Sequence, residues 1–378
     1  MTLVQIEKLI KQTESDLKRG VEMNATPIQI GAIESDLSRY RLYYKQVQSG
    51  AIKLPEINVK AILQRLGELD LKSNPVDEAK MLIDQLKTFP IMNYTLMPEG
   101  EGYYADSMIR ARPYKKTEPT FTIPVQLNYK PQEYNNNYQR ASTKDKTVFY
   151  GCLKRINGEL ITQSVDGKEI DNRFVATMEA MSMLRDINSE KKVAKVAHGK
   201  WVVMKPIKLV AIVGGKDRVL NNPGIKKMYD AFKEKVSEID MLDEAISIAD
   251  FFADQFANKE AGSGKEHLYL LSALFSEAWM NTATVDGIFY PSVRTEYQGI
   301  CIALNVNAAE SKIKLIGAGE AMVYKNKDKG IIDNLTFVDV PLDAKSYTFK
   351  SVDTQYMMGE KQALVNLGLT SFDELEYA

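Results

Sequence analysis

Among the residues of this chain, Ser292 is a candidate for a role in catalysis because of its position in the sequence. Ser292 follows Pro291 at the end of the apolar run Ile288 to Tyr290, and a second apolar run spans Gly299 to Leu304. Because proline fixes its own backbone and favours an extended residue before it, we expect Ser292 just past a strand end, where its hydroxyl can point into a cleft. The alternative is a turn serine that hydrogen-bonds its own backbone.

Histidine chemistry has little support. The chain has two histidines, His198 and His267, and neither lies near a cysteine or carboxylate at metal-ligand spacing. A zinc site or a histidine-based triad is therefore not expected, and no metal is predicted. Any reaction must run on Arg, Glu, Tyr and Ser.

Two glycine patterns resemble phosphate-binding loops but lack the decisive residues. The segment Gly262 to Lys265 has Lys259 where the first glycine belongs and Glu266 where a Ser or Thr must bind magnesium. The segment Gly317 to Gly319 has Met322 at the third glycine position and no helical pattern after it, so we expect a turn there.

Composition and charge are those of an ordinary globular protein. The chain has 378 residues, of which 44% are hydrophobic and 26% charged, and this length suggests two or three domains. Its 49 Lys and Arg residues against 50 Asp and Glu leave a formal net charge of -1. With no overall field to attract it, nucleic acid is not expected as a partner.

Cysteine usage and hydropathy favour the cytoplasm. Cys152 and Cys301 lie in apolar strand-like runs, so we expect two buried free thiols and a reducing compartment. The first residues mix charged with apolar side chains, unlike a secretory signal. No apolar run approaches the roughly 20 residues that span a bilayer, so no membrane partner is expected.

The first part of the chain has helical periodicity. Apolar residues recur at helical spacing in four stretches, and Thr26 followed by Pro27 offers an N-cap and a first-turn proline. Residues 1–90 are predicted to form a small helical module for dimerisation, regulation or partner binding. Its second helix carries the basic residues Arg39, Arg41 and Lys45, for which a solvated helix face is the ordinary interpretation.

After residue 98, short aromatic and β-branched runs alternate with helical patterns. The runs include Phe121 to Leu127, Val148 to Leu153 and Val202 to Ile212, and a helix is predicted from Phe174 to Ile187. Because these elements lack a regular βαβ rhythm, we predict a mixed α+β fold rather than a doubly wound parallel sheet.

Five segments, in this order, resemble the motifs of the RES domain family, which is named for its Arg, Glu and Ser residues. They are Met108 to Pro113 with Arg110 and Arg112, Tyr138 to Ser142 with Arg140, Val148 to Leu153 with Tyr150, Ala176 to Ala180 with Glu179, and Asp286 to Leu304 with Ser292 and Arg294. In the second segment, Gln139 replaces a glycine and Ser142 an asparagine of the family pattern. The resemblance covers roughly residues 100 to 325.

The resemblance implies a fold and an activity. The fold is similar to that of ADP-ribosyltransferase toxins, with a catalytic domain at residues 100–340 and a tail at 341–378. The activity is cleavage of NAD⁺ between nicotinamide and ribose, with NAD⁺ as substrate and no other cofactor. Compact members of the family are bacterial toxins neutralised by a helix-turn-helix antitoxin, which makes such an antitoxin, besides a second copy of the chain, a candidate partner.

The resemblance also implies roles for its residues. Glu179 stabilises the developing positive ribose or orients the attacking water. Arg110 and Arg140 hold the pyrophosphate, Tyr150 borders the nicotinamide, and Ser292 hydrogen-bonds the carboxamide or the ribose.

Two further arginines are candidate binding residues. Arg112 belongs to the first segment. Arg294 lies two positions beyond Ser292 and, in an extended chain, points to the same side.

Other interpretations stay open. Taken singly, Glu179 can be an exposed helix charge, Arg110 a surface strand residue and Tyr150 a core aromatic. At the level of function, the alternatives to a glycohydrolase or phosphorolase are a protein ADP-ribosyltransferase and a non-catalytic NAD-binding module.

Overall fold

A long mixed β-sheet organises the molecule. The computed structural model describes residues 3–22, 27–49, 57–98, 107–156, 159–160, 170–185, 191–215, 222–262, 264–282, 284–353 and 357–378. Across the sheet the strands run β1 (Asn93–Leu96), β7 (Ile207–Ala211), β8 (Gly287–Pro291), β9 (Ile300–Asn305), β3 (Val148–Leu153), β2 (Met108–Pro113), β6 (Lys191–Val203), β10 (Ile313–Asn326), β11 (Lys329–Asp339) and β12 (Lys350–Ser351). The pairs β7–β8 and β6–β13 (Glu376–Tyr377) are parallel and the others antiparallel. The predicted mixed α+β class is confirmed.

The central strands β8, β9 and β3 are buried on both faces. Along β9, Cys301 and Ala303 enter one apolar cluster while Ile300, Ile302 and Leu304 enter the opposite one. This alternation follows from the two-residue period of a strand. Runs that are apolar at every position, as these are, therefore need a cover on each side of the sheet.

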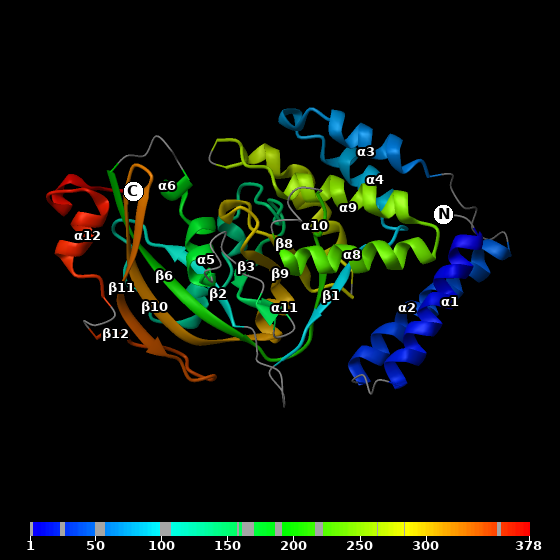
Figure 1. The fold of residues 1–378 in the computed structure, drawn as a ribbon, viewed down its shortest axis with the longest axis horizontal. Helices are drawn as coiled ribbons and strands as arrows, with labels where there is room; N and C mark the ends of the chain where they lie inside the picture. Colours follow the sequence, from blue (N-terminus) through cyan, green and yellow to red (C-terminus); the bar gives the residue numbers. More distant parts are fainter. Residues whose placement is uncertain are drawn as a thin grey trace.

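Helices cover the face to which Cys301 points. These are α3 (Val59–Glu68), α4 (Val76–Leu86), α9 (Leu242–Phe256) and α10 (Leu270–Met280), with α10 almost wholly buried among them (Figure 1). Leu66 and Ile83, on α3 and α4, have no exposed surface and share one core with strand residues. The predicted module at residues 1–90 therefore divides, because α3 and α4 belong to the main body.

The first two helices form a hairpin that joins the main core through Leu9. Helix α1 (Leu3–Glu22) packs along α2 (Pro27–Gln48), which begins at a proline as predicted; Thr26 lies outside the described residues. The hairpin meets α8 (Pro223–Glu238) through an ion pair of 2.6 Å between Asp16 and Lys235. Figure 1 places it at one end of the molecule and α12 (Glu360–Leu367) at the other.

The remaining elements are short. They are α5 (Asn172–Ala180), α6 (Ser182–Arg185), α11 (Val306–Ser311), the hairpin β4 (Arg155–Ile156) and β5 (Glu159–Leu160), and the 3-10 turns η1 (Leu71–Ser73), η2 (Pro124–Leu127), η3 (Gln132–Tyr134), η4 (Glu266–Tyr269), η5 (Val293–Thr295) and η7 (Phe372–Glu374). None of the described helices is both long and apolar enough to cross a bilayer.

Three sequence-based expectations are corrected. The run Phe121 to Leu127 is not a strand, because Pro124 opens the 3-10 turn η2. The glycines from Gly317 to Gly319 lie within strand β10 and form no turn, since pairing with β6 and β11 on both sides holds them extended. The run Val202 to Ile212 splits around Pro206 into the end of β6 and β7.

The helix predicted from Phe174 onward is also shorter than expected. Helix α5 starts at its N-cap Asp171, whose side chain accepts from the backbone N–H of Arg173, and ends at Met181, which is extended. Helix α6 then continues to Arg185, and residues 186–187 lie outside the described part. The break leaves Glu179 in the last turn of α5.

The segment predicted as a tail, 341–378, is part of the sheet. Strand β12 pairs with β11, β13 pairs with β6, and α12 packs Ala363 and Leu367 against Ile331. Figure 1 shows α12 beyond the outer strands, whereas α5 lies near the middle of the molecule.

A buried histidine fastens α5 to the sheet. His198 on β6 lies 2.8 Å from the hydroxyl of Thr177 on α5, and both side chains are buried. Burial, aided by the positive charge of Arg173, lowers the pKa of His198 to about 3. The ring is therefore neutral at pH 7.

This shift predicts a pH-dependent stability. As pH falls from about 6.5 toward 3, the unfolded chain binds a proton at His198 that the folded chain excludes, so stability present above pH 6.5 is lost at about 1.4 kcal/mol per pH unit. Urea unfolding of wild type and His198→Gln at several pH values should show the two stabilities converging on acidification. His267→Gln is the control, and parallel curves for wild type and His198→Gln would contradict the assignment.

Candidate functional site

Ser292 lies just past a strand end, as predicted. Strand β8 ends at Pro291, and Ser292 is the N-cap of η5. The N–H of Ser292 donates to the carbonyl of Gly299 (2.7 Å), and its own carbonyl accepts from the N–H of Tyr297 (2.8 Å). The Ser292 side chain has no exposed surface and is fixed in direction.

The hydroxyl of Ser292 donates to the carboxylate of Glu179. The distance from Oγ to Oε1 is 2.6 Å, and the two residues are 113 positions apart in sequence. A hydrogen bond of this length to a carboxylate is among the stronger types in proteins. The fold thus joins the serine and the glutamate that the sequence predicted to work together, and the alternative of a serine bonded only to its own turn is wrong.

Arg140 is a buried cation beside this pair. It is 5% exposed, and its Nη1 and Nη2 have no hydrogen-bond partner among the described residues. Its guanidinium lies over the ring of Tyr269, 5.2 Å from the centroid, and 6.0 Å from that of Tyr290. Burial opposes the charge, but Glu179 and the neighbouring tyrosines outweigh it, and the pKa of Arg140 is raised.

Tyr150 holds the turn that carries Arg140. Its hydroxyl accepts from the backbone N–H of Ala141 (3.0 Å), and burial raises its pKa, so it stays a neutral phenol. It therefore lies close to Arg140, with its oxygen hydrogen-bonded within the protein.

Arg110 and Arg112 are not brought to this pair. They alternate along β2 with Ile109 and Ala111, which border the same core cluster as Tyr290, and so point to the other face of the sheet. Arg110 Nη1 donates to the carbonyl of Tyr150 (3.0 Å), while burial and the charge of Arg112 lower its pKa to about 10.

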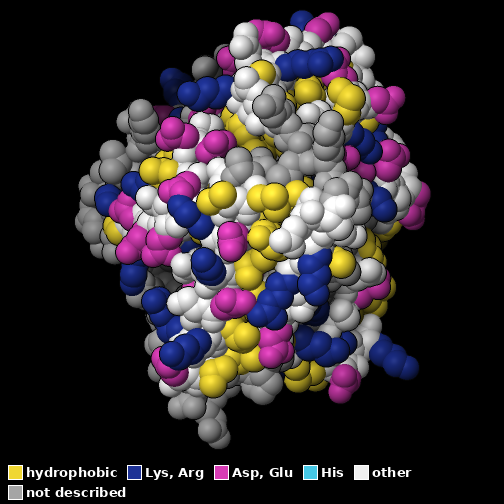
Figure 2. Space-filling model, turned by 90° about the vertical axis from the view of Figure 1, so that its right-hand side faces the viewer, with side chains coloured by type: hydrophobic (Ala, Val, Ile, Leu, Met, Phe, Trp, Pro, Cys, Tyr) yellow, Lys and Arg dark blue, Asp and Glu magenta, His cyan; other side chains and the backbone are white. Residues whose placement is uncertain are grey.

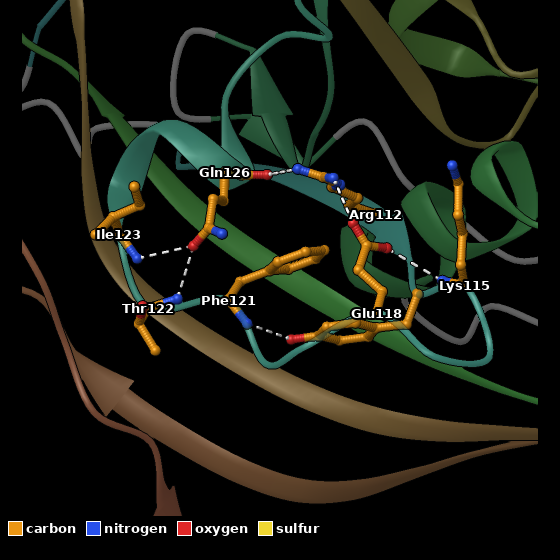
Figure 3. A network of polar contacts seen from close by, with 8 residues as sticks. Arg112, Lys115, Glu118, Phe121, Thr122, Ile123 and Gln126 are labelled. Carbon is orange, nitrogen blue, oxygen red and sulfur yellow. Dashed lines mark hydrogen bonds and ion pairs between the residues drawn. The ribbon is translucent and has the colours of Figure 1, made fainter.

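The donors of Arg112 are used within a loop. They reach the carbonyl of Gln126 (2.5 Å) and the carboxylate of Glu118 (2.8 Å). Figure 3 shows this network, in which Glu118 also accepts from the N–H of Lys115 and the Gln126 side chain accepts from the N–H groups of Thr122 and Ile123. In this structure Arg112 shapes the loop after β2.

Arg294 fastens another loop. Its guanidinium donates to the carbonyls of Lys259 (3.2 Å) and Ala261 (3.0 Å), and the latter also accepts from the hydroxyl of Tyr269. The expected alignment of Arg294 with Ser292 assumed an extended chain, whereas η5 is helical. Arg294 thus connects the serine corner to the loop that precedes Tyr269.

Sequence reasoning missed two aromatic residues of the site. Tyr290 is separated from Ser292 only by Pro291, and strand alternation could have placed its ring on the Cys301 face. Tyr269 lies in η4, far from Arg140 in sequence, and no local sequence pattern indicates that the two residues meet. Together their rings flank Arg140.

Two thiols lie beside the site. Cys152 and Cys301 face each other across β3 and β9 with their sulfurs 3.7 Å apart, and both are free and buried, as predicted. The contact with Cys152 and burial raise the pKa of Cys301. It is therefore a thiol rather than a reactive thiolate.

The loop after Ser292 is strained. Glu296 and Tyr297 are consecutive left-handed residues, with φ of 51° and 67°, although neither is glycine. A Cβ on the nearby Gly299 would lie 2.6 Å from Val175 of α5, so the loop must approach that helix closely. A strained backbone conformation persists only where surrounding contacts hold it in place, and such conformations are often found at functional sites.

The described residues contain no group of three His, Cys, Asp or Glu side chains that could hold a metal ion. They do bring together a carboxylate oriented by a hydroxyl, a buried guanidinium with free donors and two aromatic rings. Such a set can stabilise a developing positive charge next to an anionic group.

Comparisons with known proteins assign no family to this site. No family model matches the chain, and no curated protein matches it either. The resemblance to the RES domain family therefore stays a prediction, and the site is argued from its geometry.

The strain predicts opposite effects of two Glu→Gly changes. At the exposed Glu296, glycine removes a left-handed penalty of about 1–2 kcal/mol and adds about 0.5–1 kcal/mol of backbone entropy cost, for a net gain of up to about 1.5 kcal/mol. At the exposed Glu234, inside α8, the same change should cost about 1 kcal/mol. Urea denaturation measures both, and destabilisation by Glu296→Gly would show that the loop is relaxed.

Proposed function

We propose that this chain consumes NAD⁺ by cleaving the bond between nicotinamide and ribose, using Glu179, Ser292 and Arg140. The observation that carries the proposal is the 2.6 Å hydrogen bond from Ser292 to Glu179, beside a buried arginine whose Nη atoms have no acceptor among the described residues. The three residues come from separate parts of the chain, and apolar strands and helices surround them.

This residue set suits the reaction. Nicotinamide leaves as a neutral molecule from a cationic pyridinium, so the leaving group needs no general acid and no histidine. The ribose acquires positive charge in the transition state, and a fixed carboxylate stabilises that charge. By donating to Oε1, Ser292 fixes the direction of the Glu179 carboxylate, which then acts on the ribose or on the attacking group.

Arg140 suits the pyrophosphate. Leaving buried N–H donors unpaired costs about 1–3 kcal/mol for each group, and an anionic oxygen would supply the missing acceptors. Arg110 then acts indirectly. It donates to the backbone carbonyl of Tyr150, and the Tyr150 hydroxyl in turn holds the turn that carries Arg140. Arg112 and Arg294 keep their loops in place.

The proposed reaction can take three forms, which differ in the molecule that accepts the ADP-ribosyl group. Water makes the chain a glycohydrolase and phosphate a phosphorolase, while a protein side chain makes it an ADP-ribosyltransferase. A cytoplasmic toxin with a helix-turn-helix antitoxin is the biological setting that the family resemblance implies for the first two.

One assay distinguishes the possibilities. The purified chain is incubated with NAD⁺, with or without phosphate, and nicotinamide is quantified. Release without a protein target supports hydrolysis or phosphorolysis, and release only with added protein supports transfer to protein. Calorimetric binding of NAD⁺ without release would leave a non-catalytic binding module and refute the proposed reaction.

Two substitutions should abolish or slow turnover without loss of fold. Glu179→Gln removes the charge and should reduce NAD⁺ loss to background; because it leaves Arg140 without its counter-charge, the melting temperature should also fall, and circular dichroism must show that the variant is folded. Ser292→Ala removes the hydrogen bond that orients Oε1 of Glu179 and should slow turnover by roughly 10- to 100-fold. Matched controls are Glu277→Gln, a half-buried carboxylate paired with Lys80, and Ser276→Ala, a fully buried serine that donates to a helix carbonyl. Wild-type turnover in Glu179→Gln would refute the assigned role.

Arg140→Met tests the anion contact. Because the change removes one partner of an interacting pair of opposite charges and leaves Glu179 without it, the variant should melt at a lower temperature, and circular dichroism must show that it is folded. Its NAD⁺ binding, measured by calorimetry, should weaken at least tenfold, as expected for a lost charge-assisted contact of about 1.4 kcal/mol or more. Unchanged affinity would exclude Arg140 from the binding site.

A further inference from the structure

The outer side of α2 has features of an interface. A surface helix ordinarily carries one apolar stripe, and that of α2 includes Leu37, which is 5% exposed. On the other side Leu42 is 60% exposed. Figure 2 views the hairpin end of the molecule and shows hydrophobic side chains lying between interleaved acidic and basic ones. The exposed residues of α2 that share this side include Gly31, Glu34, Ser38, Arg41, Leu42 and Lys45.

The charges on this side of α2 complement the same side of α2 in a second copy of the chain. Glu34 lies in the first half of α2 and Arg41 in the second, seven residues apart and therefore on the same flank. In an antiparallel pair of α2 helices related by a two-fold axis, residues of the same flank meet. With the axis near residue 37, Glu34 lies opposite the partner's Arg41, and the symmetry repeats the contact.

The shapes on this side agree with the same register. A Cβ built on Gly31 would meet nothing within 4 Å, so the surface there is open. An axis near residue 37 also places the partner's Leu42 over Gly31. A large exposed side chain thus meets a small one, twice, just beyond the two ion pairs along the helix.

We propose that two copies of this chain associate through an antiparallel pairing of their α2 helices. The mixture of acidic and basic residues suits a second copy better than a partner of one charge sign, such as nucleic acid. One helix side buries less than the roughly 1,200–2,000 Å² of a stable complex, so we expect a dissociation constant in the micromolar range. The pairing is independent of the reaction proposed for the Glu179 site.

Sedimentation of the full chain from about 1 to 100 μM, a range that brackets micromolar affinity, tests the association. Wild type should shift from monomer to dimer, and Leu42→Glu should raise the dissociation constant by about tenfold or more, because an apolar contact is lost and a charge is introduced. A monomer at every concentration, or a dimer unaffected by Leu42→Glu, overturns the proposal.

Mixing two charge variants tests the antiparallel register. Glu34→Lys and Arg41→Glu should each be monomeric alone, since each brings like charges together. An equimolar mixture should dimerise, because the two introduced charges have opposite signs and face each other, while the unchanged Arg41 of one copy faces the unchanged Glu34 of the other. No gain on mixing overturns the register. Arg41 also bonds Glu14 of α1 (2.6 Å), so circular dichroism must show equal helicity in both variants.

A cross-link provides a test that needs no charge change. Ser38→Cys places a thiol near the two-fold axis, and a short bismaleimide should link two copies in the wild-type background. Lys18→Cys, on the exposed side of α1, is the control. Equal cross-linking at the two positions would place the contact elsewhere and overturn the proposal.

Discussion

The structure depends on placing opposite charges close to each other at the edge of an apolar core. Arg140 is buried, and the half-buried Glu179 interacts with it electrostatically. Burying the Arg140 charge without a counter-charge would cost several kcal/mol. Both residues are positioned by neighbours, Glu179 by the hydroxyl of Ser292 and the Arg140 turn by the hydroxyl of Tyr150. A buried arginine whose Nη atoms have no acceptor among the described residues is a poor way to stabilise a core and a suitable way to bind an anion.

The local structure around these residues is shaped to bring them together. Strand β8 must stop at Pro291 for Ser292 to turn inward, and α5 must break at Met181 so that Glu179 ends its last turn. The loop after Ser292 accepts two left-handed residues to return to β9. Helix α5 is held at its start by Asn172, which donates to the carbonyls of Ser107 and Cys152, and near its end by the contact between Thr177 and His198, so the carboxylate rests on a fixed helix.

Part of this site could be predicted from sequence. Pro291 indicated the corner, and the helical pattern around Glu179 indicated its helix. Strand periodicity also indicated that Tyr150 and Tyr290 lie within the sheet. The faces of β2 could not be predicted, because a change of one residue in register exchanges them, and Arg110 and Arg112 accordingly point away from Glu179. Tyr269 had no local signal, since only the packing of η4 brings it over Arg140.

The whole molecule shows the same contrast between features that the sequence indicates and features that depend on tertiary structure. The sequence by itself determined the strands around Ser292, the helices of the first part of the chain and the proline that ends β8, because backbone geometry and apolar periodicity act over a few residues. Tertiary structure decided that α3 and α4 join the main core, that β10 runs through its glycines and that the last residues complete the sheet. It also decided that Ser292 meets Glu179. These outcomes depend on pairing between distant segments, whose partners no local pattern specifies.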